Sequence, residues 1–415
     1  MPEKLNLYTW KNIFYMDLEG VCMFKAIKGK WVQYQERKQM EFLEGETKKL
    51  LEKAFHTAQI FLEMKGDYGK NYVYPTVSRV SILNTHIEIL GHIPKGMNPN
   101  VFQQKEYIFQ QYFSENMAIH TGASHFKIQI FPERMDIVPY CYEDFPINKM
   151  KMPIVAGKDR FNQWVTFSMI KNPNVLIAGI PGSGKSVMCR QLLTTLMLHH
   201  TEKELEIHLL DLKGSEFHIF EHCEHVKSMS VTVQEFSPIM RKLRKELDRR
   251  GRVLREHGVA HIDKLPKGKR MNYILLMIDE VLLLNDGTKE GKEVKEMLLK
   301  WAALGRALGC YTVISLQRPC HKSLDTALRG VLNVRVVFKT EDKTNSEIAG
   351  VVGAEKISRE ESGRMIFKID TDDMKDVQAP FLEVEEAQEL IEPFLCKKPY
   401  ETKEIKDEEV FNLLS

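Results

Sequence analysis

One segment of the chain has the spacing of a phosphate-binding loop. The string GIPGSGKS satisfies the pattern G-x-x-x-x-G-K-[ST], whose glycines let successive backbone N–H groups point at phosphate oxygens. An apolar strand is predicted before it, at Val175–Ala178, and a helix after it, whose N-terminus also favours an anion. A chance glycine-rich turn would lack these flanking elements. The predicted nucleotide-binding residues are Gly179, Ile180, Pro181, Gly182, Ser183, Gly184, Lys185 and Ser186.

This motif predicts ATP and Mg²⁺ as cofactors. Lys185 is expected to reach the β- and γ-phosphates, and the Ser186 hydroxyl to coordinate Mg²⁺, which prefers oxygen ligands. A second apolar strand, Tyr273–Ile278, ends in Asp279 and Glu280. Asp279 is expected to be the other metal ligand, and Glu280 to activate the attacking water as a base. The sequence therefore predicts an ATP-hydrolysing site.

A polar amide follows a third apolar strand. Gln317 comes directly after Thr312–Leu316, at the end where a parallel sheet would place the γ-phosphate. Its side chain could contact that phosphate or the attacking water, and so report hydrolysis to the next element. The alternative is a glutamine that makes only a turn hydrogen bond.

The elements around these residues indicate a parallel sheet. Short apolar strands alternate with longer amphipathic helices, which implies crossover connections and a three-layer α/β sheet. The predicted strands are Val175–Ala178, Ile207–Leu210, Tyr273–Ile278, Tyr311–Leu316 and Val334–Phe338.

The chain before this region has the pattern of a small mixed α+β domain. Its predicted strands are Val80–Leu83, His86–Leu90 and His125–Ile130, and a helix capped by Asn100 is expected through Phe113. A longer helical pattern spans Lys38–Lys65, with an apolar face formed by Leu50, Leu51, Ala54, Ala58 and Phe61. The predicted division is 1–150 for this domain, 151–385 for the α/β domain and 386–415 for a charged tail.

Composition favours a soluble, cytoplasmic protein. The 415 residues are 43% hydrophobic and 28% charged, and the seven cysteines form no CxxC pair, as expected for reduced thiols in a cytosol. No secretory signal is expected, and no apolar run approaches the roughly 20 residues of a membrane-spanning helix. The net charge is only +2, so binding to a polyanion would need a local basic patch.

Several strings occur in the order seen in FtsK/SpoIIIE DNA translocases, and the chain resembles that family from about Ile154 to Pro380. The strings are GIPGSGKSV, DLKGSEF, MRKLRKELDRRGRVLREHGVAHIDKL, ILLMIDEVLLL and GRALGCYTVISLQRP. More weakly, Tyr74–Val80 resembles the small domain that precedes the motor. The resemblance implies a RecA-like P-loop NTPase motor domain that threads double-stranded DNA through a homo-oligomeric ring, usually a hexamer.

The resemblance also assigns roles to single residues. Lys185 and Glu280 match the catalytic positions, and Gln317 matches the sensor glutamine. An arginine from the neighbouring subunit is expected to stabilise the transition state. Its candidates here are Arg306, Arg318 and Arg335, of which Arg306 and Arg318 lie in the best-matching strings.

Two departures indicate which members of the family the chain resembles. No N-terminal membrane helix is visible, and only about 35 residues follow Pro380, too few for a sequence-reading winged-helix module. These features resemble the compact FtsK-like ATPases of plasmids, phages and integrative conjugative elements. Such a chain could be recruited to the membrane by a partner, either a transfer channel or a relaxase.

A basic segment could hold the DNA. A helix is predicted over Ser237–Glu256, with Ser237 as its cap and Pro238 at its first position. Its basic residues are Arg241, Lys242, Arg244, Lys245, Arg249, Arg250, Arg252 and Arg255, and the loop after it holds Lys264, Lys267, Lys269 and Arg270. Such residues would give sequence-independent, salt-sensitive binding to phosphates. The alternative is a solvated helix face partly neutralised by Glu246, Asp248 and Glu256.

Other functions remain open from the sequence. A protein-secretion motor would use the same ATPase module, although such chains usually hold several in tandem and this one has a single phosphate loop. A nucleotide-dependent scaffold that barely hydrolyses ATP is disfavoured by the presence of both Asp279 and Glu280. The spacing of His218, His222, Cys223 and His225 loosely suggests zinc, but no second ligand group matches it, so no zinc site is expected.

Overall fold

The computed structural model describes residues 25–66, 69–83, 85–114, 116–131 and 134–396, which form two compact units. The first unit runs to Met135 and includes Arg160–Asn162, and the second holds the rest. Residues 136–150, which the sequence assigned to the first domain, lie in the second unit. They do so because Phe145 and Ile147 are buried in a cluster with Val155 and Leu382.

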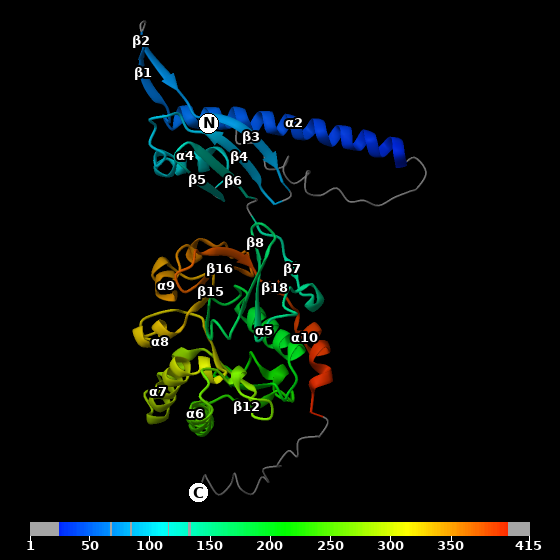
Figure 1. Cartoon of the computed structure of the whole chain (residues 1–415), viewed down its shortest axis with the longest axis vertical. Helices are drawn as coiled ribbons and strands as arrows, with labels where there is room; N and C mark the ends of the chain where they lie inside the picture. Colours follow the sequence, from blue (N-terminus) through cyan, green and yellow to red (C-terminus); the bar gives the residue numbers. More distant parts are fainter. Residues whose placement is uncertain (1–24, 67–68, 84, 115, 132–133, 397–415) are drawn as a thin grey trace, which may run out of the picture. The chain divides into compact units, whose positions relative to one another are not determined.

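The first unit is an antiparallel sheet covered by helices (Figure 1). The strand order is β3-β4-β6-β5, and a hairpin of β1 and β2 extends from it. Phe55 on helix α2 meets the rings of Phe102, Phe109 and Phe126 edge-on, so aromatic contacts join the helices to the sheet. The elements are α2 (Lys25–Thr57), β1 (Leu62–Gly66), β2 (Gly69–Val73), β3 (Thr76–Ile82), β4 (Ile87–His92), α3 (Val101–Gln104), α4 (Glu106–Tyr112), β5 (Met117–Thr121) and β6 (His125–Ile130).

Two predicted helices of this unit differ from the structure. The long helix ends at Thr57, because Gln59 takes a left-handed φ of 54° and Ile60 N–H then donates to Phe55 O at 3.0 Å, which closes the helix. Phe61 therefore lies outside it. The helix predicted from Asn100 to Phe113 is two short helices, α3 and α4, and the Asn100 side chain does not cap them.

The second unit is built on a ten-stranded sheet with the order β12-β11-β13-β14-β10-β15-β16-β17-β8-β9. From β12 to β15 the strands run parallel, as predicted, and the remaining strands extend the sheet antiparallel. The bounds are β8 (Pro153–Asp159), β9 (Trp164–Ser168), β10 (Asn174–Ala178), β11 (Leu205–Asp211), β12 (Val226–Ser230), β13 (Tyr273–Asp279), β14 (Cys310–Leu316), β15 (Val334–Phe338), β16 (Arg364–Ile369) and β17 (Lys375–Gln378). A short parallel pair joins β7 (Val138–Pro139) to β18 (Pro380–Phe381).

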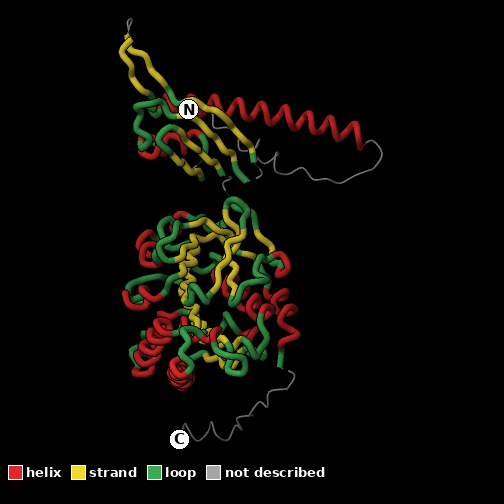
Figure 2. The backbone as a smooth tube through the Cα atoms, viewed as in Figure 1, coloured by secondary structure: helices red, strands yellow, loops and turns green. Residues whose placement is uncertain are grey.

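Helices cover both faces of this sheet, which confirms the predicted three-layer α/β fold (Figures 1 and 2). Met188 and Leu192 of α5 belong to the core on one face, and Leu243 of α6 and Leu298 of α7 belong to the core on the other. The helices are α5 (Lys185–His199), α6 (Val233–Glu256), α7 (Lys289–Leu304), α8 (Thr326–Val331), α9 (Lys343–Ala349) and α10 (Val384–Ile391).

One helix start and the start of the predicted tail differ from the structure in this unit. Helix α6 begins at Val233, because Thr232 Oγ1 accepts the Glu235 N–H at 3.2 Å and caps the helix one turn before Ser237. The segment predicted as a tail from residue 386 begins inside α10, where Ala387 and Ile391 are buried. Residues 397–415 of that segment lie outside the described residues.

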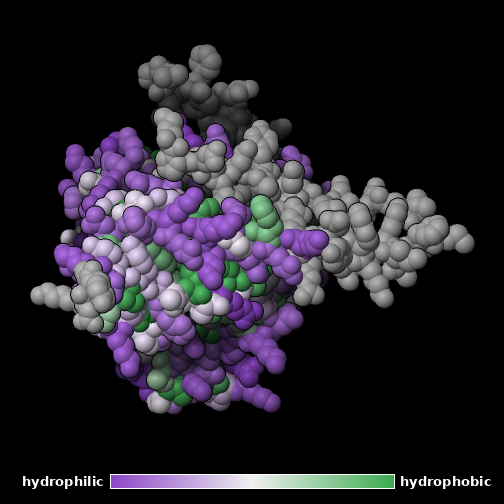
Figure 3. Space-filling view, turned by 90° about the horizontal axis from the view of Figure 1, so that it is seen from above, coloured by the Kyte–Doolittle hydropathy of each residue, from purple (hydrophilic) through white to green (hydrophobic). Residues whose placement is uncertain are grey.

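The face shown in Figure 3 is mainly hydrophilic, with apolar residues in small separate groups. Exposed apolar side chains of the first unit include Phe42, Met64 and Tyr72. Isolated exposed apolar residues are normal on protein surfaces and do not by themselves indicate an interface.

Arg250 is a buried cation that ties α6 to the sheet. Its guanidinium donates to Glu246 Oε1 at 2.9 Å, to Asn272 O and Oδ1 at 2.7 Å each, and to Leu308 O at 2.9 Å. Its side chain is only 1% exposed, so this residue is not part of the basic surface to which the sequence assigned it. The hydrogen bonds hold α6 against the residues that precede β13 and β14.

We expect Arg250→Met to destabilise the second unit by about 3 kcal/mol, because the partners of a buried charge would be left unpaired. Urea unfolding followed by circular dichroism would measure the change. Arg252→Met is the matched control, since Arg252 is exposed on the same helix and should leave the midpoint unchanged. Equal midpoints for the two variants would contradict the bracing role of Arg250.

Candidate active site

The predicted site residues come together at the carboxyl ends of three neighbouring strands. The phosphate loop follows β10, Asp279 ends β13, and Gln317 follows β14, which lies between the other two strands. All residues of these three strands are buried, so their ends are fixed by the core. This edge of a parallel sheet is where open α/β proteins bind ligands.

Two glycines of the phosphate loop have no room for a side chain. Gly184 has φ 109°, and a Cβ there would lie 2.8 Å from the backbone N of Gly363. A Cβ at Gly179 would lie 2.6 Å from Ser183 Oγ. Gly182, in contrast, has φ 78° and nothing within 4 Å of that position, so its left-handed backbone, and not a lack of space, favours glycine there.

A segment that sequence reasoning missed supports the loop. Ser362 Oγ donates to Gly182 O at 3.1 Å, and Gly363 N donates to Ser183 O at 2.9 Å. Both residues precede β16, one of the antiparallel strands that the sequence pattern did not reveal. No motif marks these two residues, because their role is to hydrogen-bond to the backbone of the phosphate loop.

Lys185 forms a buried ion pair with Asp279. Its Nζ lies 2.9 Å from Asp279 Oδ1 and 2.9 Å from Ser315 Oγ, and Ser315 Oγ donates to the same carboxylate oxygen at 2.8 Å. Burial lowers the pKa of Lys185, but Cys189 and Asp279 raise it by more. Burial raises the pKa of Asp279, while Lys185 and Lys213 lower it by more. Both shifts favour the charged forms at neutral pH.

Glu280 has a backbone conformation that is rare for a residue with a side chain. Its φ and ψ are 54° and 63°, a left-handed geometry that typically costs on the order of 1 kcal/mol or more and is often found at functional sites. Its Oε2 accepts the Gln317 N–H at 3.1 Å. The backbone of Gln317 thus orients the predicted base, while a role for the Gln317 side chain stays a prediction.

The loop after β11 brings two further charged residues to the site. Lys213 Nζ lies 2.9 Å from Glu280 Oε2, and Ser186 Oγ donates to Glu216 Oε1 at 2.8 Å. Both residues lie in the string DLKGSEF, for which the sequence alone predicts no role. The signal was present, because the string directly follows a strand whose carboxyl end lies beside that of β13.

The arrangement fits Mg²⁺ and a nucleoside triphosphate. Asp279 Oδ2 and Ser183 Oγ are buried and make no hydrogen bond within the described residues, so each has capacity for a ligand. Ser186 and Asp279 provide the hard oxygen donors that Mg²⁺ prefers. Lys185 and the loop N–H groups provide the positive charge for phosphate oxygens.

The three candidate arginines lie in different surroundings. Arg318 directly follows Gln317 and is 64% exposed, with its Nε 3.2 Å from Glu341 Oε2. Arg306 is also exposed but precedes β14, so it lies at the opposite edge of the sheet. Arg335 is in β15, where burial lowers its pKa to about 10 and its Nη2 donates to Arg329 O. Arg335 is half-buried in the sheet, whereas Arg306 and Arg318 are exposed.

Four of the eight basic residues named for α6, the buried Arg250 among them, form ion pairs within the described residues. Arg241 contacts Glu293, Arg244 contacts Asp248 at 3.3 Å and Arg249 contacts Glu246. The exposed loop after the helix differs, since its lysines and arginine form no ion pair within the described residues, although Asp263 of the same loop pairs with Lys151. Its basic members are Lys264, Lys267, Lys269 and Arg270.

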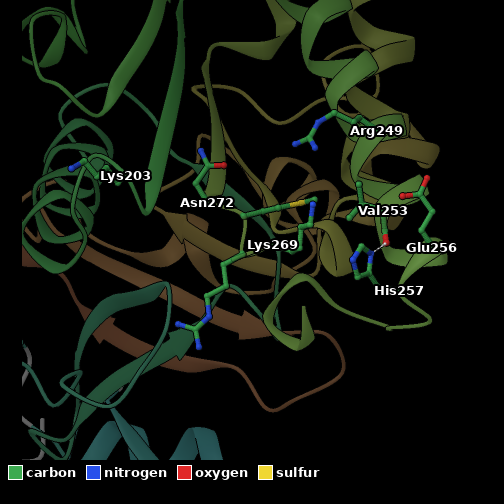
Figure 4. Close-up of a pocket in the computed structure, with 9 residues that line it drawn as sticks. Lys203, Arg249, Val253, Glu256, His257, Lys269 and Asn272 are labelled. Carbon is green, nitrogen blue, oxygen red and sulfur yellow. Dashed lines mark hydrogen bonds between the residues drawn. The ribbon is translucent and has the colours of Figure 1, made fainter. Parts of the chain in front are cut away.

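Part of this loop lines a cavity of about 490 Å³ at the amino ends of β11 and β13, opposite the phosphate loop (Figure 4). Helix α6 forms one wall of the cavity. The lining residues are Lys203, Arg249, Val253, Glu256, His257, Lys269, Arg270, Met271 and Asn272. Because basic side chains predominate, the cavity is a candidate site for phosphate groups.

Comparisons with known proteins agree with the motifs. Residues 142–272 match the family model described as FtsK/SpoIIIE family. Two relatives named DNA translocase FtsK, from Chlorobaculum tepidum and Caldanaerobacter subterraneus subsp. tengcongensis, are 27% and 30% identical to this chain, each over 272 residues. These matches include 62% and 64% of this chain but only 33% and 38% of the relatives, so the chain spans about a third of their length.

Solved structures share the fold. The conjugation coupling protein TcpA of pCW3, in a monomer form with ATPγS, has a TM-score of 0.59 and 24% identity, covering 83% of this chain and 99% of TcpA. The cytoplasmic domain of the Type VII secretion ATPase EccC from Thermomonospora curvata has a TM-score of 0.51 and 20% identity, covering 62% of this chain and 33% of EccC.

None of the described helices combines the length and apolar composition that crossing a membrane requires. The phosphate loop, Gly179–Ser186, lies within the residues that match the family model. The resemblance predicted from the sequence is therefore confirmed: residues 142–272 match the FtsK/SpoIIIE family model, and the chain is similar to relatives named DNA translocase FtsK.

Proposed function

We propose that this chain hydrolyses ATP to move double-stranded DNA through a ring of its own copies, most simply a hexamer. The observation that supports this most strongly is the convergence of Lys185, Asp279 and Glu280 at one sheet edge. The sequence relatives named DNA translocase support the choice of cargo.

In this proposal each residue of the site has a separate role in hydrolysis. Lys185 binds the β- and γ-phosphates, and Ser186 and Asp279 hold the metal. When bound, Mg²⁺ neutralises charge that develops on the phosphates. Glu280 accepts the proton of the attacking water, and the N–H of Gln317 holds its carboxylate in position. The Gln317 side chain would contact the terminal phosphate or the water.

The DNA contacts that we propose come from the loop Lys264–Arg270 and the adjoining cavity. These residues are exposed, basic and far from the nucleotide site along the strands. Contacts to phosphates, unlike contacts to base edges, suit a motor that steps along any sequence. DNA binding there would thus leave the hydrolytic site unobstructed.

The biological setting that we propose is transfer of plasmid, phage or conjugative-element DNA in the cytoplasm. The similarity in fold to a conjugation coupling protein motivates this choice. In such a setting a membrane transfer channel or a relaxase would be the partner that recruits the motor. The similarity to a secretion ATPase is likewise one of fold, but with lower identity and coverage, 20% over 62% of this chain against 24% over 83% for the coupling protein.

Glu280→Gln should bind ATP and hydrolyse it on the order of 10²–10⁴-fold more slowly, because Gln keeps the shape but cannot accept the proton. Phosphate release measures turnover, and binding of a fluorescent ATP analogue measures affinity.

Lys185→Ala should abolish turnover, because the phosphates lose their main cation. Turnover near the wild-type rate in either variant would refute the proposed site.

A test of the ring uses mixtures of two inactive variants. An Arg318→Ala or Arg306→Ala subunit keeps its own phosphate loop, and a Lys185→Ala subunit keeps its arginine. If the arginine acts on the neighbouring site, mixing should restore part of the ATP hydrolysis for one of the two pairs. A monomer in ATP that is fully active, by mass measurement and turnover, would contradict the ring.

The DNA surface can be tested by charge removal. Replacing Lys264, Lys267, Lys269 and Arg270 by alanine should weaken duplex binding and reduce the slope of log affinity against log salt by about one per lost phosphate contact. ATP hydrolysis without DNA should persist. The matched control replaces four other exposed lysines, Lys227, Lys289, Lys292 and Lys300. Equal losses in both variants would show a general charge effect and reject this loop as the contact surface.

A further inference from the structure

The loop Asp211–Phe217, here called the β11 loop, is held in one shape by its first residue. The Asp211 carboxylate accepts four backbone N–H groups of the loop, and Asp211 itself is fully buried. The donors are Lys213 and Gly214 to Oδ1, at 3.3 and 2.9 Å, and Glu216 and Phe217 to Oδ2, at 2.8 and 3.1 Å. A loop with this many internal bonds presents its side chains from a defined position.

The Glu216 side chain fixes the β11 loop against the phosphate loop, through the hydrogen bond from Ser186 at 2.8 Å. Lys213, three residues earlier, extends to the acidic pair instead. Its Nζ lies 2.9 Å from Glu280 Oε2 and 3.6 Å from Asp279 Oδ2. The ammonium therefore lies beside the two carboxylates that the proposed chemistry uses.

The ion pair between Lys213 and Glu280 has poorer hydrogen-bond geometry and more solvent exposure than the pair between Lys185 and Asp279. Lys213 Nζ is buried, yet it meets the geometry of no hydrogen bond within the described residues, so its three N–H groups lack well-aligned acceptors. Its side chain is 23% exposed, against 4% for Lys185. An ammonium in this position is electrostatically attracted but free to turn toward a better acceptor.

We propose that Lys213 detects the γ-phosphate of the nucleotide. Without nucleotide its ammonium neutralises Glu280, and with a triphosphate bound it turns to the phosphate oxygens, which accept hydrogen bonds strongly. This movement frees the carboxylate of Glu280 to receive the proton of the water. A diphosphate lacks the γ-phosphate, so Lys213 would stay on Glu280. This inference rests on the proposed ATP hydrolysis and assigns Lys213 a part in substrate discrimination.

The test compares binding of ATPγS and ADP, each with Mg²⁺, by titration calorimetry. Lys213→Met should weaken ATPγS binding roughly tenfold and leave ADP binding nearly unchanged, since a tenfold ratio is what a modest charge-assisted contact gives. Lys213→Arg should restore most of the difference. Lys227→Met, an exposed lysine elsewhere in the unit, is the control and should change neither affinity.

A double-mutant cycle separates Lys213 from simple repulsion between Glu280 and the phosphates. Glu280→Gln should tighten ATPγS binding, because Lys213 no longer has to leave a carboxylate. In the Lys213→Met background this gain should disappear. If the gain persists there, Glu280 acts on the phosphates directly and the proposal fails.

Two further outcomes have distinct meanings. Equal weakening of ATPγS and ADP by Lys213→Met would mean that the lysine supports the site as a whole, and would overturn the proposal. A fall in the unfolding midpoint of the nucleotide-free variant would accompany such a structural role. If the wild-type chain bound neither nucleotide, the proposed function itself would fail, independently of Lys213.

Discussion

A buried lysine–carboxylate pair joins the phosphate loop to the end of the neighbouring strand β13. Lys185 Nζ lies 2.9 Å from Asp279 Oδ1 and 2.9 Å from Ser315 Oγ of β14, and both charges are almost completely removed from water. A buried pair of this kind is costly if either partner is lost. The positions of the loop, the metal ligands and the base all depend on it, because each lies within a few residues of one partner.

The sheet provides the constraint that keeps this pair in place. The strands that carry the site are buried along their whole length, and Arg250 fastens α6 to the opposite edge. The edge with the phosphate loop is consequently rigid, while Lys213 on the adjoining loop keeps partial exposure. In our account this combination lets a rigid site respond to the presence of a terminal phosphate.

The sequence was sufficient where chemistry or periodicity leaves a local pattern. The phosphate loop, Asp279 and the parallel strands have such patterns, and the observed β15 agrees residue by residue with the prediction. The sequence was insufficient where contacts between distant segments determine the burial or pairing of a residue. The Gly363 contact, the burial of Arg250 and the pairing of Lys213 with Glu280 each join residues more than 20 positions apart. The start of helix α6 was mispredicted because two residues could cap it, and Thr232 caps it in place of Ser237.

The central claim is that hydrolysis at this site drives movement along duplex DNA. Displacement of a third strand from a triplex-containing duplex measures such movement directly, since a translocating motor removes the strand as it passes. The account predicts displacement by the wild-type chain with ATP and none by Lys185→Ala. Vigorous ATP hydrolysis without displacement, on duplexes of several lengths, would contradict it.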